Sequence, residues 1–234
     1  MSFLADVVGW FTTAAHWRGE NGIPHRLSEH LLLSALCVLV AAAVALPIGM
    51  GLGHLGRGGA VAVNLANVGR AIPSFAILVL ATEVVGIGAR PAFVALVALA
   101  LPPMVTNSYV GVREVDPEVR EAARGMGMTG AQVLRRVEAP LALPLVLAGV
   151  RTAAVQVVAT ATLAALVAWG GLGRYIVDGL SQRDFVQVFA GAVLVAAVAT
   201  LTEVVLAALE RAVTPFRHDG PTSGKTGADV AAAT

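Results

Sequence analysis

The side chains best suited to bind another molecule are concentrated in residues 113–140, a charged stretch within an otherwise apolar chain. Four small or flexible apolar residues recur there at helical spacing and predict one continuous stripe: Val119, Ala122, Ala123 and Met126. Charged residues flank the stripe: Arg120, Glu121 and Arg124. Because small side chains permit close approach of another helix or groove, the pattern favours docking to a partner protein over the alternative, an interfacial helix resting on lipid.

Local signals define two short helices that would position this stripe. Asp116 is a good N-cap for the first helix, and we expect Gly125 and Gly127 to end it. Thr129 opens a capping box that starts the second helix, which we expect to end before Pro140. Residues 113–140 are therefore predicted to form a helix–turn–helix.

Other chemistry has little support in the sequence. The five histidines lack metal-ligand spacing and Cys37 is the single cysteine, so we assign no catalytic and no metal-binding residue. Residues 220–226 superficially resemble a phosphate-binding loop, but they have three residues between the glycines where that loop needs four. The net charge of +1 gives no case for nucleic acid as a partner. A membrane enzyme would need a converging nucleophile, base or metal site, which we do not find.

The composition predicts an all-α membrane protein. The 234 residues are 57% hydrophobic and 13% charged, far from the roughly 25% charged of soluble domains. About five transmembrane helices are expected, over residues 31–52, 61–85, 92–112, 141–169 and 185–208. The second is irregular, with a broken beginning and a main helix from near Pro73. In the third, Pro102 and Pro103 should break or bend the helix.

The chain divides into three parts. Residues 1–30 are expected to be an external, interfacial segment with Trp10 and Trp17 at headgroup level. Residues 31–210 form the transmembrane domain, and residues 211–234 read as a disordered cytoplasmic tail. Nine Lys and Arg residues fall on the side that holds residues 113–140 and five on the other, which predicts an outside N-terminus and a cytoplasmic C-terminus.

Polar residues within the predicted spans are candidates for a solute path or for helix packing. Arg151 and Glu203 lie at similar depths from the cytoplasmic ends of their helices, about 15 and 9 Å, so we predict a structural ion pair. A polar stripe along the fourth span, with three further positions, could line a path: Thr152, Gln156 and Thr160, and Ser74, Thr106 and Asn107. Hydrogen bonding between helices is at least as good an account of this stripe.

The segment 121–140 also resembles a known family pattern. Glu121-Ala122-Ala123, then Gly127 after three residues, Val137 after nine more, and Ala139-Pro140 follow the EAA pattern E-A-A-x3-G-x9-I-x-L-P of permease subunits of binding-protein-dependent ABC importers. Val137 and Ala139 depart from it conservatively. Residues 70–74, 101–107, 149–153, 159–163 and 170–173 further resemble the osmoprotectant permeases for glycine betaine, carnitine and choline, so the similarity spans roughly residues 29–212.

The resemblance implies an ABC importer permease fold and a role in transport without enzymatic activity of its own. Residues 113–140 would carry a cytoplasmic coupling helix that contacts an ATPase through these positions: Glu121, Ala122, Ala123, Arg124, Gly125, Met126, Gly127, Val137 and Pro140. The implied partners are two ABC ATPase subunits that hold ATP and Mg, a second permease subunit, identical or related, and an extracytoplasmic binding protein, all at a prokaryotic plasma membrane. The cargo would be a small osmolyte. The alternatives are a permease for an amino acid or methionine and, in another class, an ion-gradient-driven secondary transporter.

Overall fold

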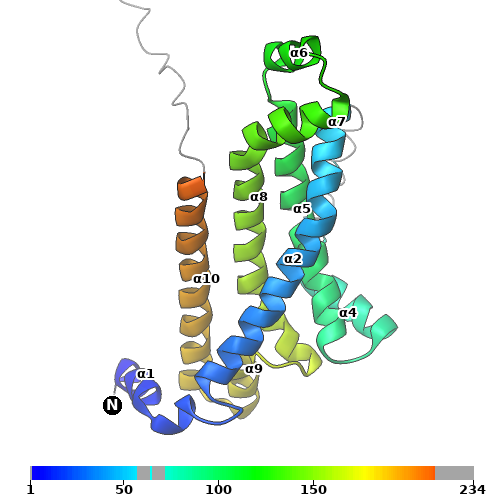
Figure 1. The fold of residues 1–234 in the computed structure, drawn as a ribbon. Helices are drawn as coiled ribbons and strands as arrows, with labels where there is room; N and C mark the ends of the chain where they lie inside the picture. Colours follow the sequence, from blue (N-terminus) through cyan, green and yellow to red (C-terminus); the bar gives the residue numbers. More distant parts are fainter. Residues whose placement is uncertain (1, 57–63, 65–71, 214–234) are drawn as a thin grey trace, which may run out of the picture.

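The chain forms a bundle of helices in a computed structural model that describes residues 2–56, 64 and 72–213, and these ranges hold no strand (Figure 1). Four helices are long and apolar enough to cross a membrane: Ile23–Leu55 (α2), Ala89–Arg113 (α5), the continuous helix Gly130–Val167, which contains α8 (Ala139–Thr160), and Phe185–Val213 (α10). The shorter helices are α1 (Phe3–Thr12), α4 (Ser74–Val85), α6 (Pro117–Gly125), α7 (Gly130–Val133) and α9 (Gly173–Gln182). The predicted all-α membrane fold is confirmed.

The second predicted span is only partly described. Its described portion, α4, has 12 residues, which is about 18 Å of helix and short of the roughly 30 Å hydrocarbon layer. The rest of that prediction, residues 61–63 and 65–71, lies outside the described residues, as do residues 214–234 of the predicted tail.

The centre of the bundle is α5, which packs against α2 on one side and α8 on the other (Figure 1). Small residues allow this close packing. A Cβ on Gly49 of α2 would lie only 2.6 Å from the carbonyl oxygen of Val105 in α5. The buried core contains many alanines, among them Ala41, Ala45 and Ala153. In lipid, such small residues give helices van der Waals contact along their backbones.

The two adjacent prolines do not break the third predicted span. Helix α5 runs without interruption through Pro102 and Pro103, and both rings are buried. The break is absent because packing from α2 and α8 on both sides holds the segment in helical geometry despite the loss of two backbone donors, whereas the other expected outcome, a bend, is not contradicted by a continuous helix.

The N-terminal segment is also arranged differently from the prediction. Helix α2 begins at Ile23, before the predicted start of the first span at residue 31. Trp10 does not lie at the surface: it is buried, and its ring packs edge-on against Tyr175 of α9 at 5.4 Å between centroids. Trp17 is exposed, as an interfacial residue would be. The packing of α1 on α9 and α10 buries Trp10, which periodicity alone could not reveal.

Candidate coupling site

Helix α6 lies at one end of the bundle, beyond the C-terminal end of α5 and beside α7 (Figure 1). The Asp116 carboxylate accepts a hydrogen bond from the backbone N–H of Glu118 at 2.8 Å, and Pro117 occupies the first turn. Both features stabilise the beginning of this short helix, as predicted. It therefore forms a defined surface element although it has only nine residues.

Gly127 ends α6 in the left-handed conformation. Its φ is +84°, the N–H of Gly127 donates to the carbonyl of Arg124 at 2.9 Å, and the N–H of Met128 donates to the carbonyl of Ala123 at 3.2 Å. This paired bonding closes the helix end and favours glycine, because other residues are strained there. Gly125 is exposed in the last turn.

The predicted capping box is present at Thr129, whose N–H donates to the Gln132 side chain at 2.7 Å. The second helix, however, does not end before Pro140. A π-helical turn, Leu134–Glu138, joins α7 directly to α8, and Pro140 lies in the first turn of α8. The N–H of Ala139, the residue before Pro140, donates to the carbonyl of Leu134 five positions back, so the π hydrogen-bond pattern carries the helix up to the proline and the chain continues as one helix. The expected stop was therefore wrong.

The predicted apolar stripe of α6 divides into an exposed part and a buried part. Val119, Ala122 and Met126 are exposed, and Met126 shows 73% of its surface. Ala123 is 2% exposed and packs into the protein. The remaining predicted coupling residues are exposed except for half-buried Val137: Glu121, Arg124, Gly125, Gly127 and Pro140. The outer face of α6 is thus a small apolar patch with charged neighbours, available to a partner.

Three charged or polar side chains that the motif did not predict hold α6 to the bundle, and we call them the anchor cluster: His54, Arg120 and Glu138. The Glu138 carboxylate is completely buried in the π turn and pairs with His54 Nδ1 of α2 at 2.5 Å. Arg120 Nε of α6 lies 3.4 Å from the other Glu138 oxygen. One Arg120 nitrogen also donates to the carbonyls of Val112 and Arg113 at the end of α5.

The anchor cluster connects elements distant in sequence, because His54 and Glu138 are separated by 84 positions. The only signal in the sequence was a lone carboxylate, Glu138, next to the apolar end of the EAA pattern. Such a residue has to find a partner when it is buried. Nothing in the sequence indicated which partner.

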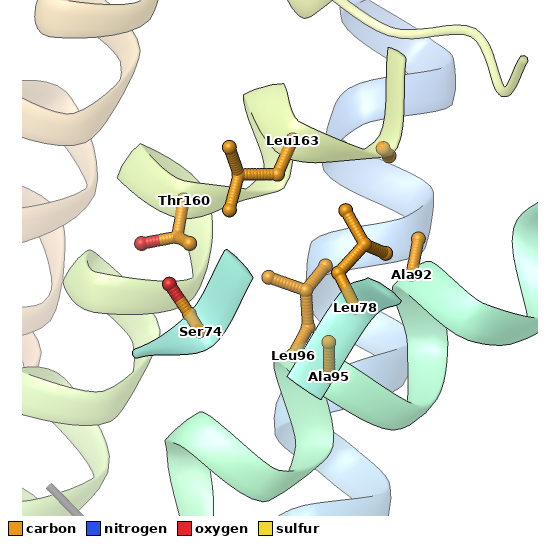
Figure 2. Close-up of a pocket in the computed structure, with 8 residues that line it drawn as sticks. Ser74, Leu78, Ala92, Ala95, Leu96, Thr160 and Leu163 are labelled. Carbon is orange, nitrogen blue, oxygen red and sulfur yellow. The ribbon is translucent and has the colours of Figure 1, made fainter. Parts of the chain in front are cut away.

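The candidate path residues do not converge on one large cavity. Ser74 and Thr160 lie at one end of a small cavity between α4, α5 and the end of α8, lined otherwise by apolar side chains such as Leu78 and Leu96 (Figure 2). Its volume is about 10 Å³, room for about one water molecule. A solute the size of an osmolyte does not fit there.

The other path candidates are divided between the inside and the outside of the bundle. Thr106 is half-buried, and Asn107 donates to the carbonyl of Pro103 at 2.8 Å within α5. Thr152 and Gln156 are exposed on α8, facing away from the rest of the chain. A solute path lined by them would have to be completed by another molecule.

Arg151 and Glu203 are in contact, as their predicted depths suggested. Arg151 Nη1 lies 2.9 Å from Glu203 Oε1 and joins α8 to α10. Sequence reasoning missed a second carboxylate: Glu210 lies 3.3 Å from Arg151 Nε, two helical turns further along α10. Two carboxylates on one helix face therefore surround one guanidinium.

Within the described ranges, no group of three or more His, Cys, Asp or Glu side chains is arranged to hold a metal ion. The candidate site is an exposed face of α6 with buried ionic contacts beneath it.

Comparison with known proteins agrees with this arrangement. Residues 43–215 match the family described as binding-protein-dependent transport system inner membrane component. The chain is 37% identical to the glycine betaine/carnitine/choline transport system permease protein OpuCB of Bacillus subtilis, over 82% of this chain and 88% of that protein. It is 38% identical to the carnitine transport permease protein OpuCB of Listeria monocytogenes, over 84% and 91%.

A similar solved structure is a chain of the MetNI methionine ABC transporter in an inward-facing conformation. The TM-score is 0.69 at 25% identity, and the match covers 80% of this chain and 93% of that one. The helical arrangement described above is therefore shared with an ABC transporter.

Proposed function

Because this chain belongs to the binding-protein-dependent transport system inner membrane components, we propose that it is the permease subunit through which an ATP-driven importer moves a quaternary ammonium osmolyte into the cell. Membership of this family supports the role of a transport subunit without enzymatic activity of its own. The observation that carries the proposal is the exposed face of α6, whose residues follow the spacing of the EAA pattern and which is supported by buried contacts from three other elements.

The α6 face is the contact for a cytoplasmic ATPase. Val119, Ala122 and Met126 form a small apolar patch, and the charged side chains of Glu121 and Arg124 lie at its edge. Two copies of the ATPase, which hold ATP and Mg, bind two such patches, one from each permease. Their closure around ATP moves α6, and α6 moves the helices of the bundle.

This role requires α6 to be cytoplasmic. The α6 end carries Arg113, Arg124, Arg135 and Arg136, and the positive-inside rule therefore supports this orientation. Helices α1 and α9 then lie at the external end (Figure 1), with the N-terminus outside and the C-terminus of α10 inside. An extracytoplasmic binding protein delivers the solute to that external end.

A second permease, identical or related, completes the solute path. Thr152 and Gln156 are exposed polar residues in the middle of a membrane helix. The Thr152 hydroxyl donates to the carbonyl of Ala148 at 2.9 Å, whereas the Gln156 amide would be costly to expose to lipid. Facing a partner permease or a water-filled path, Gln156 loses this penalty. Ser74 and Thr160, at the edge of the small cavity, extend the same polar surface when the helices move apart.

The cargo is assigned from the relatives. The two OpuCB permeases, one named for glycine betaine, carnitine and choline and one for carnitine, are 37% and 38% identical to this chain over 82% and 84% of its length. The methionine transporter chain is 25% identical. These values favour an osmolyte over methionine, and membership of an ABC family favours ATP over an ion gradient as the energy source.

The test is uptake into membrane vesicles that contain the permease, its ATPase and its binding protein. Radiolabelled glycine betaine should accumulate with ATP, and accumulation should stop when the ATPase is omitted. Unlabelled choline or carnitine should compete, and methionine should not. Uptake that persists without the ATPase but follows an ion gradient would refute the proposal, and competition by methionine alone would refute the cargo.

A further inference from the structure

The most heavily buried ionic group in the described part of the cytoplasmic end is the anchor cluster. Glu138 has no exposed surface, and the side chains of Arg120 and His54 are 11% and 17% exposed. Burying a carboxylate is strongly unfavourable unless it is paired. A docking patch on α6 does not by itself need such a group, since a small apolar contact could hold α6 in place.

The contacts of the cluster meet at the junction of four elements. His54 belongs to the last turn of α2, Arg120 to α6, and Glu138 to the π turn that leads into α8. Through two hydrogen bonds of 2.9 and 2.7 Å, Arg120 also holds the carbonyls that end α5. One short, buried ionic path therefore connects α6 to each of the three long helices α2, α5 and α8.

The direct apolar contacts of α6 with the bundle are small by comparison. Ala123 is its one fully buried side chain, and α6 contacts mainly α7 and the π turn. The small side chain of Ala123 provides little contact area to resist sliding of α6 over the bundle. The His54–Glu138 hydrogen bond and the two hydrogen bonds from Arg120 to α5 are directional, and the Arg120–Glu138 ion pair at 3.4 Å connects them.

From this geometry we infer that His54, Arg120 and Glu138 are the positioning residues that pass the movement of α6 to α2, α5 and α8. The inference rests on the proposed function, because it concerns how a docked ATPase drives the bundle. The three side chains do not touch the ATPase or the solute. Their loss leaves the outer α6 face intact, so ATP hydrolysis continues while less of the movement reaches the helices.

The test measures uptake and ATP hydrolysis in the same proteoliposomes, with permease, ATPase and binding protein reconstituted together. Glu138→Gln keeps the shape of the side chain and removes its charge. We expect the amount of solute moved per ATP hydrolysed to fall by about tenfold. This factor lies within the roughly 5- to 150-fold effects that ordinary coupling free energies produce. Glu114→Gln, at an exposed glutamate of the same cytoplasmic end, is the matched control and should leave this ratio unchanged.

The ratio separates a positioning role from a structural one. If the substitution only reduces the amount of folded transporter, uptake and hydrolysis fall together and the ratio stays constant, which would overturn the inference. If Glu138→Gln does not accumulate in the membrane, His54→Ala is measured in the same way, with His54→Asn, whose amide nitrogen takes the place of Nδ1, as the conservative variant that still donates to Glu138 and keeps the ratio. A wild-type complex without ATP-dependent uptake would instead refute the proposed function itself.

Discussion

The contact between α2 and α5 gives the sharpest stability prediction. A Cβ added at Gly49 would lie 2.6 Å from the Val105 carbonyl oxygen and 2.7 Å from the Ser108 Cβ. Moving the first contact to 3.4 Å, the onset of ordinary van der Waals distance, requires the two helices to separate locally by about 0.8 Å. Backbone atoms of a packed helix cannot yield as a flexible side chain does. We therefore expect Gly49→Ala to cost about 1–3 kcal/mol, the usual range for overpacking.

Gly51 in the same helix provides the control. A Cβ at Gly51 meets nothing within 4 Å, so Gly51→Ala should be neutral or stabilising by up to about 1 kcal/mol through helix propensity. The measurement is the free energy of unfolding of the purified permease, titrated with sodium dodecyl sulfate in mixed micelles. If the two variants have equal stability, the close approach of α2 and α5 is not what requires glycine, and the packing argument fails.

Three further outcomes are expected. Met126→Asp, at the 73% exposed residue that directly follows α6, should weaken binding of the ATPase at least tenfold in a pull-down titration while the unfolding free energy changes by less than about 0.5 kcal/mol. A large loss of stability would show that α6 is not a free docking face. Gly127→Ala should destabilise the end of α6 by about 1–2 kcal/mol because the φ of +84° at this position is strained for alanine. The substitution should also speed hydrogen exchange of the α6 amides, and unchanged exchange would contradict the assigned helix end. Glu203→Gln should lower the unfolding free energy of the permease because Arg151 then keeps only one carboxylate partner, Glu210. Glu83→Gln, at an exposed glutamate, is the control, and equal effects of the two variants would count against the ion pair.

Much of the coupling site could be predicted from the sequence because its signals are local. The Asp116 cap and the Thr129 capping box involve groups two or three positions apart. Gly127 ends the helix through its own left-handed backbone conformation. Hydropathy likewise indicated the long helices, since twenty consecutive apolar residues have few alternatives to crossing a membrane. Such features need no knowledge of the rest of the chain.

The expectations that failed concern competition between local preference and packing. Pro102 and Pro103 disfavour a helix locally, but α2 and α8 enclose them and α5 continues. Pro140 was expected to end a helix, and a π turn carries the helix past it instead. Tryptophan is a residue type typical of interfacial anchors, but α9 and α10 bury Trp10. For the prolines of α5 and for Trp10 the deciding neighbours are distant in sequence, whereas for Pro140 the deciding π turn directly precedes the proline.

The sequence by itself determined the membrane class, the long apolar helices, and the residues and caps of the α6 face, because each depends on composition or on groups within one or two turns. Only the tertiary structure decided that Glu138 meets His54 across 84 positions, that Arg151 has two carboxylates, and that Ser74 and Thr160 share one small cavity. A buried charge must find a partner, and which partner it finds depends on how the helices pack.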